Sequence, residues 1–282
     1  MCNMVEVNDE QERIKLSQQI GLKLLEAFDQ VCKSNQINYF LDAGTLLGAF
    51  RNGKFIPWDD DIDIMMFRED FNKLKSLKNQ FTGDFEYQDT TTDKYYTWYL
   101  PRLLWKNSDI YYHKTAIDKR AKNKLSLDIF IIDNAPKSKL VFKLWITLIK
   151  LFTGMSKRNI SFHLYPMSEK LLLYFSAFLS SLIPKNSQIK IYTYLACLFN
   201  ESKTTHRVVL NHSFARMSDY MSFNIFDKTK WIEFENKQYP VPNDTQSYLE
   251  THYGKNFRDL PPVKSRMPHP VDVFKIKVED VV

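Results

Sequence analysis

The sequence predicts an α+β fold in which a mixed sheet is flanked by helices and carries a helical insertion. The chain has 282 residues, 44% hydrophobic and 15% aromatic, which is enough to bury a sizeable core. Short β-prone runs alternate with amphipathic stretches over residues 1–136, and long apolar helical runs replace them from Lys139 onward. With only seven Gly, the chain has no Gly-rich linker. We therefore expect one domain with an insertion.

The expected core, residues 1–136, begins with a long helix. Apolar residues such as Ile20, Leu24 and Phe28 recur at helical steps, which predicts a helix from Asp9 to Asn35. The next elements follow from local composition and turn residues. They are a short strand over 37–41, a turn at 42–44, a helix from 45 that ends at 51–53, a strand over 61–64, a polar helix over 68–80, strands with a hairpin within 87–112, and a strand over 125–132.

The expected insertion, residues 137–210, is basic and apolar. Its helical runs at 140–152, 171–183 and 189–199 are shorter than the roughly 20 residues needed to cross a bilayer. Residues 134–210 hold eleven cations and two anions, a net charge of +9, whereas the whole chain carries +6. The remainder therefore carries −3, and partners of this segment should be anionic.

Two interpretations of this insertion stay open. In the first helical run, Lys139, Lys143 and Lys150 fall near one line of the helix, while Phe142 and Trp145 belong to the opposite, apolar face. The segment is either a helical subdomain with a solvated lysine face, or it contacts an anionic membrane through residues 139–200. Residues 211–282, which are rich in turns and proline, are expected to complete the main domain.

Cysteine usage and the first residues indicate a cytoplasmic protein, either free or peripheral on the inner face of the cell membrane. The three cysteines, Cys2, Cys32 and Cys197, are odd in number and far apart, which disfavours a disulfide framework. The first residues are polar and acidic, unlike a secretory signal peptide.

The strongest chemical signal is a run of acids that enters an apolar segment at Trp58 to Ile64. Asp61 and Asp63 lie two apart on a predicted strand and share a face, Asp59 can join them, and Asp60 is turned away. Clustered carboxylates repel one another, so a hard cation such as Mg²⁺ is expected. Asp128 is the expected third ligand, because it is an isolated acid in an apolar strand.

Two other interpretations of the acid run are disfavoured. An EF-hand loop would need Gly where the chain has Ile64, and Glu where it has Asp70. An exposed acidic turn conflicts with the flanking Trp, Ile and Met residues, which indicate that the segment enters the core.

A second signal surrounds Gly44 and Thr45. A Gly followed by a hydroxyl residue at a helix start offers backbone N–H groups and a hydroxyl to a phosphate. An ordinary N-capping Thr is the alternative. Arg51 and Arg102 are candidate phosphate clamps, although an arginine is more often a surface ion-pair partner.

The segment YFLDAGTLLGAFRNGKFIPWDDDIDI, residues 39–64, resembles the signature of the LicD family of bacterial phosphocholine transferases, which are related to fukutin and fukutin-related protein. LDIFIID at 127–133 and YLETHYGKNFRDLPP at 248–262 follow in order, and Arg266 and His269 come after them. The resemblance implies a nucleotidyltransferase-like fold related to DNA polymerase beta. It places Gly44 and Thr45 at the family's Gly-Ser pair, Asp61 and Asp63 at the paired metal ligands, and Asp128 at the third acid. The sequence departs from minimal nucleotidyltransferases in two ways: it has Thr where they have Ser, and its gap from Thr45 to Asp61 is longer.

The resemblance also implies the reaction and its partners. A phospho-alcohol, phosphocholine first and ribitol or glycerol phosphate otherwise, would pass from a CDP-linked donor to a sugar hydroxyl of a cell-surface polysaccharide, lipopolysaccharide or teichoic acid, with release of CMP. Two Mg²⁺ or Mn²⁺ ions are expected, and no nucleic-acid substrate. Asp128 is the first candidate for the base and His269 the second. Residues expected around the donor are Gly44, Thr45, Arg51, Trp58, Arg102, Arg266 and His269.

Tyr95, Tyr96, Trp98 and Tyr99, with Trp58, could stack on cytosine or enclose a quaternary ammonium group, although core packing is the more common role of such side chains. Two other functions stay open. A glycosyltransferase could use the Asp-x-Asp pair to hold a nucleotide sugar, and it would release a nucleoside diphosphate. A scaffold protein with a degenerate site is disfavoured, because acids are present at 61, 63 and 128.

Overall fold

The expected α+β fold, a mixed sheet flanked by helices, is confirmed. The computed structural model describes residues 4–112, 118–157 and 167–280. The main sheet has the order β2-β3-β7-β5-β4, with β8 beside β7 and β9 beside β8. Of its pairings, β3 with β7 is parallel and the others are antiparallel. The strands are β2 (Phe40–Leu41), β3 (Ile62–Phe67), β4 (Phe85–Gln88), β5 (Arg102–Trp105), β7 (Ser126–Ala135), β8 (His206–Val209) and β9 (Met221–Ser222).

Two smaller sheets accompany the main one. β1 (Met4–Glu6), β12 (Val271–Lys277) and β6 (Ser108–Tyr112) form a three-stranded sheet, and β10 (Thr229–Phe234) pairs with β11 (Lys237–Pro242). Of the strands and hairpin expected within 87–112, the consecutive strands β4 and β5 do pair antiparallel, whereas β6 takes no part in that hairpin. β5 pairs with β4 and β7, whereas β6 pairs with β12 from the far end of the chain. Local composition predicts strands here but not their partners.

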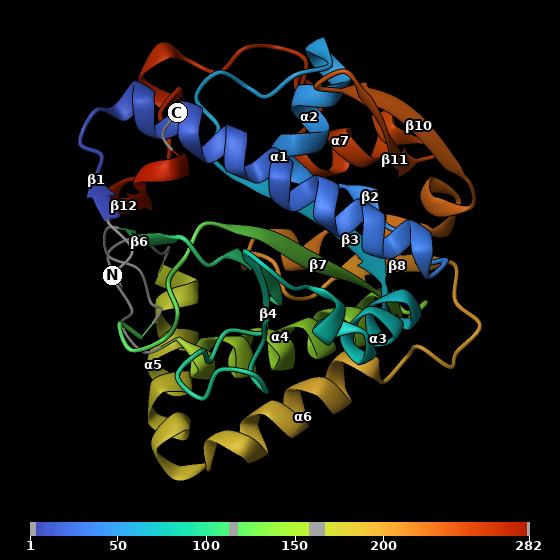
Figure 1. The fold of residues 1–282 in the computed structure, drawn as a ribbon. Helices are drawn as coiled ribbons and strands as arrows, with labels where there is room; N and C mark the ends of the chain where they lie inside the picture. The colour runs from blue at the N-terminus through green and yellow to red at the C-terminus, as the bar shows by residue number, and fades with distance from the viewer. Residues whose placement is uncertain (1–3, 113–117, 158–166, 281–282) are drawn as a thin grey trace.

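Helix α1 (Glu10–Ser34) crosses one face of the main sheet, as Figure 1 shows. Asp9 caps it, since its carboxylate accepts the backbone N–H of Glu12 at 2.8 Å. The helix approaches the sheet closely at Gly21, where a Cβ would lie 2.8 Å from Cγ1 of Ile62. α2 (Ala43–Asn52), α3 (Arg68–Ser76) and α7 (Thr245–Tyr253) complete the helices around the main core. Short 3₁₀ turns lie at Lys78–Gln80, Arg216–Ser218, Phe223–Phe226, Val263–Ser265 and Val278–Asp280.

Helices α4 (Lys139–Ser156), α5 (Met167–Leu182) and α6 (Lys185–Cys197) lie together at one end of the molecule (Figure 1). Strands β7 and β8 are antiparallel, with Ala135 opposite His206, so the chain leaves and re-enters the main sheet at one point. The helices have a core of their own, which includes Trp145, Ile149 and Tyr192. No helix in the described ranges is long and apolar enough to cross a membrane.

Candidate functional site

Asp63 and Asp128 lie side by side on neighbouring strands. β3 and β7 run parallel with Asp63 in register with Asp128, and adjacent strands are about 4.8 Å apart. Asp61 immediately precedes β3 and interacts electrostatically with both of these acids, while its carboxyl group hydrogen-bonds with that of Asp59. The structure therefore brings together the four acids 59, 61, 63 and 128, called here the acid cluster.

The acid cluster holds more negative charge than its surroundings compensate. Burial, with repulsion from Asp60 and Asp128, raises the pKa of Asp61 to about 6, although His269 opposes the shift. Burial and the neighbouring acids also raise the pKa of Asp63 and of Asp59. Burial raises the pKa of Asp128, against the opposing effects of Arg102 and of a 2.9 Å hydrogen bond from the Ser126 hydroxyl. Such a cluster would be stabilised by an added cation.

The start of α2 lies directly against the acid cluster. A Cβ on Gly44 would lie 2.2 Å from Oδ2 of Asp59, so only Gly leaves room for this carboxylate. The Thr45 side chain is 1% exposed, and its hydroxyl accepts the backbone N–H of Asp63 at 3.0 Å. Thr45, expected to face a phosphate, thus joins α2 to β3. Ala43 has a φ of 43°, a strained conformation of the kind that clusters at functional sites.

Asp42 is a buried acid beside this site that sequence reasoning did not single out. It is fully buried, caps α2 through the N–H of Ala43 at 2.6 Å, and accepts the Tyr248 hydroxyl. Its second oxygen, Oδ2, is buried without a hydrogen-bond partner. Burial raises its pKa to about 6. Its position after an apolar run was a usable signal, because an unpaired acid is costly there.

Asp60 is buried and pairs with two cationic side chains, the buried Arg13 and the exposed His269. The Arg13 guanidinium donates to its Oδ2 at 2.9 Å, and Nδ1 of His269 lies 2.9 Å from its Oδ1. Nδ1 of His269 also lies 3.7 Å from Oδ2 of Asp61. Hydrogen bonding to Asp60, together with the charges of the nearby acids, raises the pKa of His269 to about 9. The imidazolium therefore faces the acid cluster as a positive group. Sequence reasoning missed Arg13.

The arginines expected as phosphate clamps are engaged with the protein. Arg51 donates through Nη2 to the carbonyls of Phe257 and Asp259. Arg102 is 4% exposed, donates to Oε1 of Gln88 at 2.7 Å, and lies opposite Asp128 in the β5–β7 register.

The other side chains that were expected to contact the CDP-linked donor pair with one another or lie in packed clusters. Arg266 lies over the Trp58 ring, with 5.5 Å between Cζ and the ring centroid, and donates to the carbonyl of Pro261. Tyr96 is 1% exposed and packs with Tyr95 and Trp98, and Tyr99 stacks on Tyr192.

The acid cluster fits a hard divalent cation by its chemistry. All its donors are carboxylate oxygens, which Mg²⁺ prefers, and burial raises the pKa of each, with repulsion between acids adding to the shift for Asp61 and Asp63. As placed, no three His, Cys, Asp or Glu side chains among the described residues are arranged to hold an ion together. The metal assignment to Asp59, Asp61, Asp63 and Asp128 therefore stays a prediction.

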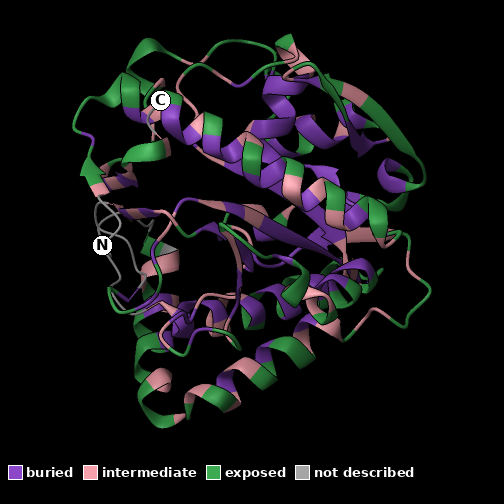
Figure 2. Ribbon diagram, in the orientation of Figure 1, coloured by how far each residue is buried: buried purple, intermediate pink, exposed green. Residues whose placement is uncertain are grey.

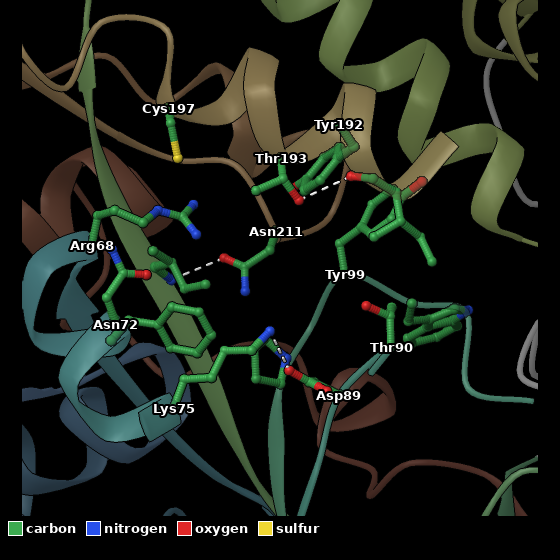
Figure 3. Close-up of a pocket in the computed structure, with 15 residues that line it drawn as sticks. Arg68, Asn72, Lys75, Asp89, Thr90, Tyr99, Tyr192, Thr193, Cys197 and Asn211 are labelled. Atoms are coloured by element: carbon green, nitrogen blue, oxygen red, sulfur yellow. Dashed lines mark hydrogen bonds and ion pairs between the residues drawn. The ribbon is translucent and has the colours of Figure 1, made fainter. Parts of the chain in front are cut away.

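A cavity of about 130 Å³ lies between α3, α6 and the loop that precedes β5, as Figure 3 shows. Lys75 pairs there with Asp89 at 2.8 Å, and Arg68 pairs with Asp133 at 2.6 Å. Ile131 of β7 lines the cavity. Because side chains alternate along a strand, Ile131 and Asp128 lie on opposite faces of β7. The cavity is thus separate from the acid cluster, and its charged side chains are paired.

Comparison with known proteins identifies one family model, one relative that covers most of the chain, and relatives that match shorter stretches. The LicD/FKTN/FKRP nucleotidyltransferase domain matches residues 36–160. The lipopolysaccharide cholinephosphotransferase LicD of Haemophilus influenzae is 30% identical over 264 residues, covering 91% of this chain and 95% of that protein. Human ribitol 5-phosphate transferase FKRP is 38% identical over 53 residues, which is 19% of this chain and 11% of FKRP. An uncharacterised Rickettsia prowazekii protein is 36% identical over 81 residues, covering 27% of this chain and 30% of that protein.

Proposed function

The chain belongs to the LicD family, and from that premise we propose that it transfers a phospho-alcohol group from a CDP-linked donor to a sugar hydroxyl, releasing CMP. Phosphocholine is the favoured group, because the relative that covers nearly the whole chain is named a cholinephosphotransferase. Ribitol phosphate and glycerol phosphate are the alternatives. The favoured acceptor is a sugar of lipopolysaccharide, of another cell-surface polysaccharide or of teichoic acid.

The observation that carries this proposal is the register of Asp63 with Asp128, with Asp61 beside them. Phosphoryl transfer depends mainly on in-line positioning and on neutralisation of charge on the phosphate oxygens. Asp61, Asp63 and Asp128 would hold Mg²⁺ or Mn²⁺, and Asp59 could join them. When bound, divalent cations neutralise diphosphate oxygens and lower the pKa of an acceptor hydroxyl.

Asp128 also acts on the acceptor hydroxyl, and two cationic side chains flank the acids. The acceptor oxygen forms a bond to the phosphorus that carries the alcohol, and the bond from that phosphorus to the CMP oxygen breaks. Asp128 takes the proton of the acceptor hydroxyl, helped by the pKa that burial raises. Arg102 opposite Asp128 and His269 beside Asp61 supply the positive charges that flank the acids.

Release of CMP tests the reaction. The chain with Mg²⁺ is incubated with CDP-choline, CDP-ribitol or CDP-glycerol and with lipopolysaccharide or teichoic acid, and CMP is measured by chromatography. We expect Asp63→Asn and Asp128→Asn to reduce CMP release at least about 100-fold, the scale for loss of an essential electrostatic group. Glu69→Gln, an exposed acid two residues past β3, is the matched control. Near-normal turnover by either Asn variant would reject the assignment.

Metal dependence tests the proposed role of the acids separately. Chelation with EDTA should stop CMP release, and Mg²⁺ should restore it. In calorimetric titration Mg²⁺ should bind the wild-type chain and bind Asp63→Asn at least about tenfold more weakly, because a ligand is lost. Full activity in EDTA would contradict the metal assignment. Release of a nucleoside diphosphate from a nucleotide sugar would instead support the glycosyltransferase alternative.

A further inference from the structure

The outer surface of α4, α5 and α6 exposes large apolar side chains. Leu144 of α4 is 63% exposed, and Phe178 and Leu182 of α5 are 60% and 63% exposed. Figure 2 shows that the outer sides of α5 and α6 are largely exposed. Soluble monomers rarely expose large apolar patches, so these side chains call for a partner. The exposed apolar residues of the three helices and of the α6 C-cap are together called here the outer face: Leu140, Val141, Leu144, Leu148, Met167, Leu171, Tyr174, Phe175, Phe178, Leu182, Ile191, Tyr194 and Leu198.

The residues of the outer face are not those of the core that holds these helices together. Phe142, Trp145 and Ile149 of α4 are buried in that core, while Leu140, Leu144 and Leu148 recur every four residues on the exposed side. The apolar face expected for α4 is buried, and Lys139 and Lys143 are exposed, as expected. The exposed side is not basic alone, however, because the three leucines lie on a further side of the helix that the sequence interpretation did not separate. A helix with apolar residues on two sides is typically covered by other groups on both of those sides.

Exposed lysines lie on the same helices as these apolar side chains. Lys139 and Lys143 of α4 and Lys190 of α6 are exposed, and residues 134–210 as a whole carry a net charge of +9. Lysine is depleted at protein–protein interfaces. Lysines beside exposed leucine and aromatic residues are instead typical of helices that lie in the headgroup region of a membrane, where the long side chains reach lipid phosphates. The charge therefore favours an anionic lipid surface over a protein partner.

We propose that the outer face binds the surface of an anionic phospholipid bilayer, with its apolar side chains at headgroup depth and its lysines on lipid phosphates. The helices lie along the membrane, since no helix in the described part of the chain can cross it. Because the insertion leaves and re-enters the main sheet at Ala135 and His206, membrane contact would hold the main domain at the bilayer. This proposal does not depend on the reaction.

Vesicle flotation of the full chain tests the proposal. We expect binding to vesicles of phosphatidylcholine with about 30% phosphatidylglycerol, weaker binding at about 0.5 M salt, and little binding to phosphatidylcholine alone. Lys139→Glu with Lys143→Glu should weaken binding at least about tenfold, since it replaces two cations that attract the anionic surface with two anions that it repels. Leu144→Asp with Phe178→Asp should weaken it similarly through lost insertion.

The matched control is Lys228→Glu with Val263→Asp, which changes an exposed lysine and an exposed apolar residue far from the outer face in the sequence. It should bind as the wild type does. Circular dichroism checks that each variant is folded. Absence of binding to anionic vesicles, or binding that neither outer-face pair weakens, would overturn the proposal. So would a wild-type dimer in sedimentation that Leu144→Asp with Phe178→Asp dissociates, because the outer face would then bind a second copy of the chain.

Discussion

At the scale of single residues, Asp60 joins three distant parts of the chain. It is 4% exposed and accepts hydrogen bonds from Arg13 of α1 and from the backbone N–H of His269. Arg13 is 7% exposed, so its charge is buried with Asp60 as partner. A buried pair contributes little net stability but is costly to break, because the remaining charge is left uncompensated.

We therefore predict that Asp60→Ala destabilises the fold. Leaving Arg13 without its partner should cost about 3–5 kcal/mol, which lowers the melting temperature on the order of 10 °C. Differential scanning fluorimetry measures this change. Glu201→Ala, at an exposed acid, is the control and should leave the melting temperature nearly unchanged. An Asp60→Ala variant as stable as this control would show that the network is not a stabilising feature.

Gly44, at the start of α2, lies against the carboxylate of Asp59. A Cβ at 44 would lie 2.2 Å from Oδ2 of Asp59, so Gly44→Ala must displace that carboxylate. Ala is a better helix former than Gly by about 1 kcal/mol, which offsets part of the steric cost. We expect a folded variant whose CMP release falls about 100-fold, as small displacements in a site can cause. Asn52→Ala, at the exposed end of α2, is the control. Normal activity of Gly44→Ala would exclude Asp59 from the reaction.

The residues of the acid cluster differ in how far the sequence predicts them. Asp61 and Asp63 could be placed because the alternation of a strand is a local rule, and Asp128 because a lone acid in an apolar strand needs a partner. The Arg13–Asp60 bond joins residues 47 positions apart, and the His269–Asp60 contact spans 209 positions. No local rule connects such pairs.

At the scale of elements, the boundaries of α1 were predictable, those of α3, α5 and α6 were off by four residues at one end, and strand partners were not predictable. The expected helix from Asp9 to Asn35 matches α1, which spans Glu10–Ser34, because periodicity and the capping Asp9 lie in the same short segment. The predicted strand over 125–132 continues to Ala135, since pairing with β8 extends it beyond its apolar residues. The pairing of β7 with β8 could not be predicted from residues 125–135, because β8 lies beyond three helices.

Helix α2 and the segment after α7 are held together by Arg51. Its Nη2 donates to the carbonyls of Phe257 and Asp259, and Phe257 packs against Phe50 with ring centroids 5.7 Å apart. This contact fastens residues 254–262 beside the helix that carries Gly44 and Thr45. A guanidinium suits the task because its fork can serve two acceptors.

We predict that Arg51→Ala loosens this segment. Hydrogen bonds from a charged group contribute about 1.5–3 kcal/mol each, so loss of two should lower the melting temperature by several degrees. Trypsin should then cleave at Lys255 and Arg258 faster than in the wild type, which mass spectrometry of timed digests measures. Lys54→Ala, an exposed cation just after α2, is the control. Equal cleavage rates in Arg51→Ala and the wild type would contradict the fastening role.

At the scale of the whole molecule, the structure has two principal cores joined through β7 and β8. The larger core surrounds the main sheet and α1, whereas the smaller one lies among α4, α5, α6 and the segment from Val208 to Met217. Polar contacts connect them. Asp133 of β7 pairs with Arg68 of α3 and accepts from Asn200, and the Thr97 hydroxyl donates to the carbonyl of Ser156. Further hydrogen bonds of this kind join Asn134 to Asn200, but the two apolar cores remain separate, which favours partly independent opening.

We predict that the smaller core opens before the larger one. Its helices leave apolar residues such as Leu144 and Phe178 exposed, so they gain less from burial than the main sheet, where Leu127 and Ile129 are fully buried. Amides of α4 and α6 should therefore exchange with solvent deuterium through local opening, at a lower free energy than the amides of β3 and β7. Hydrogen-exchange mass spectrometry at several denaturant concentrations measures both free energies. A single common value would mean that the insertion and the main domain unfold as one cooperative unit, because the contacts between the two cores couple them.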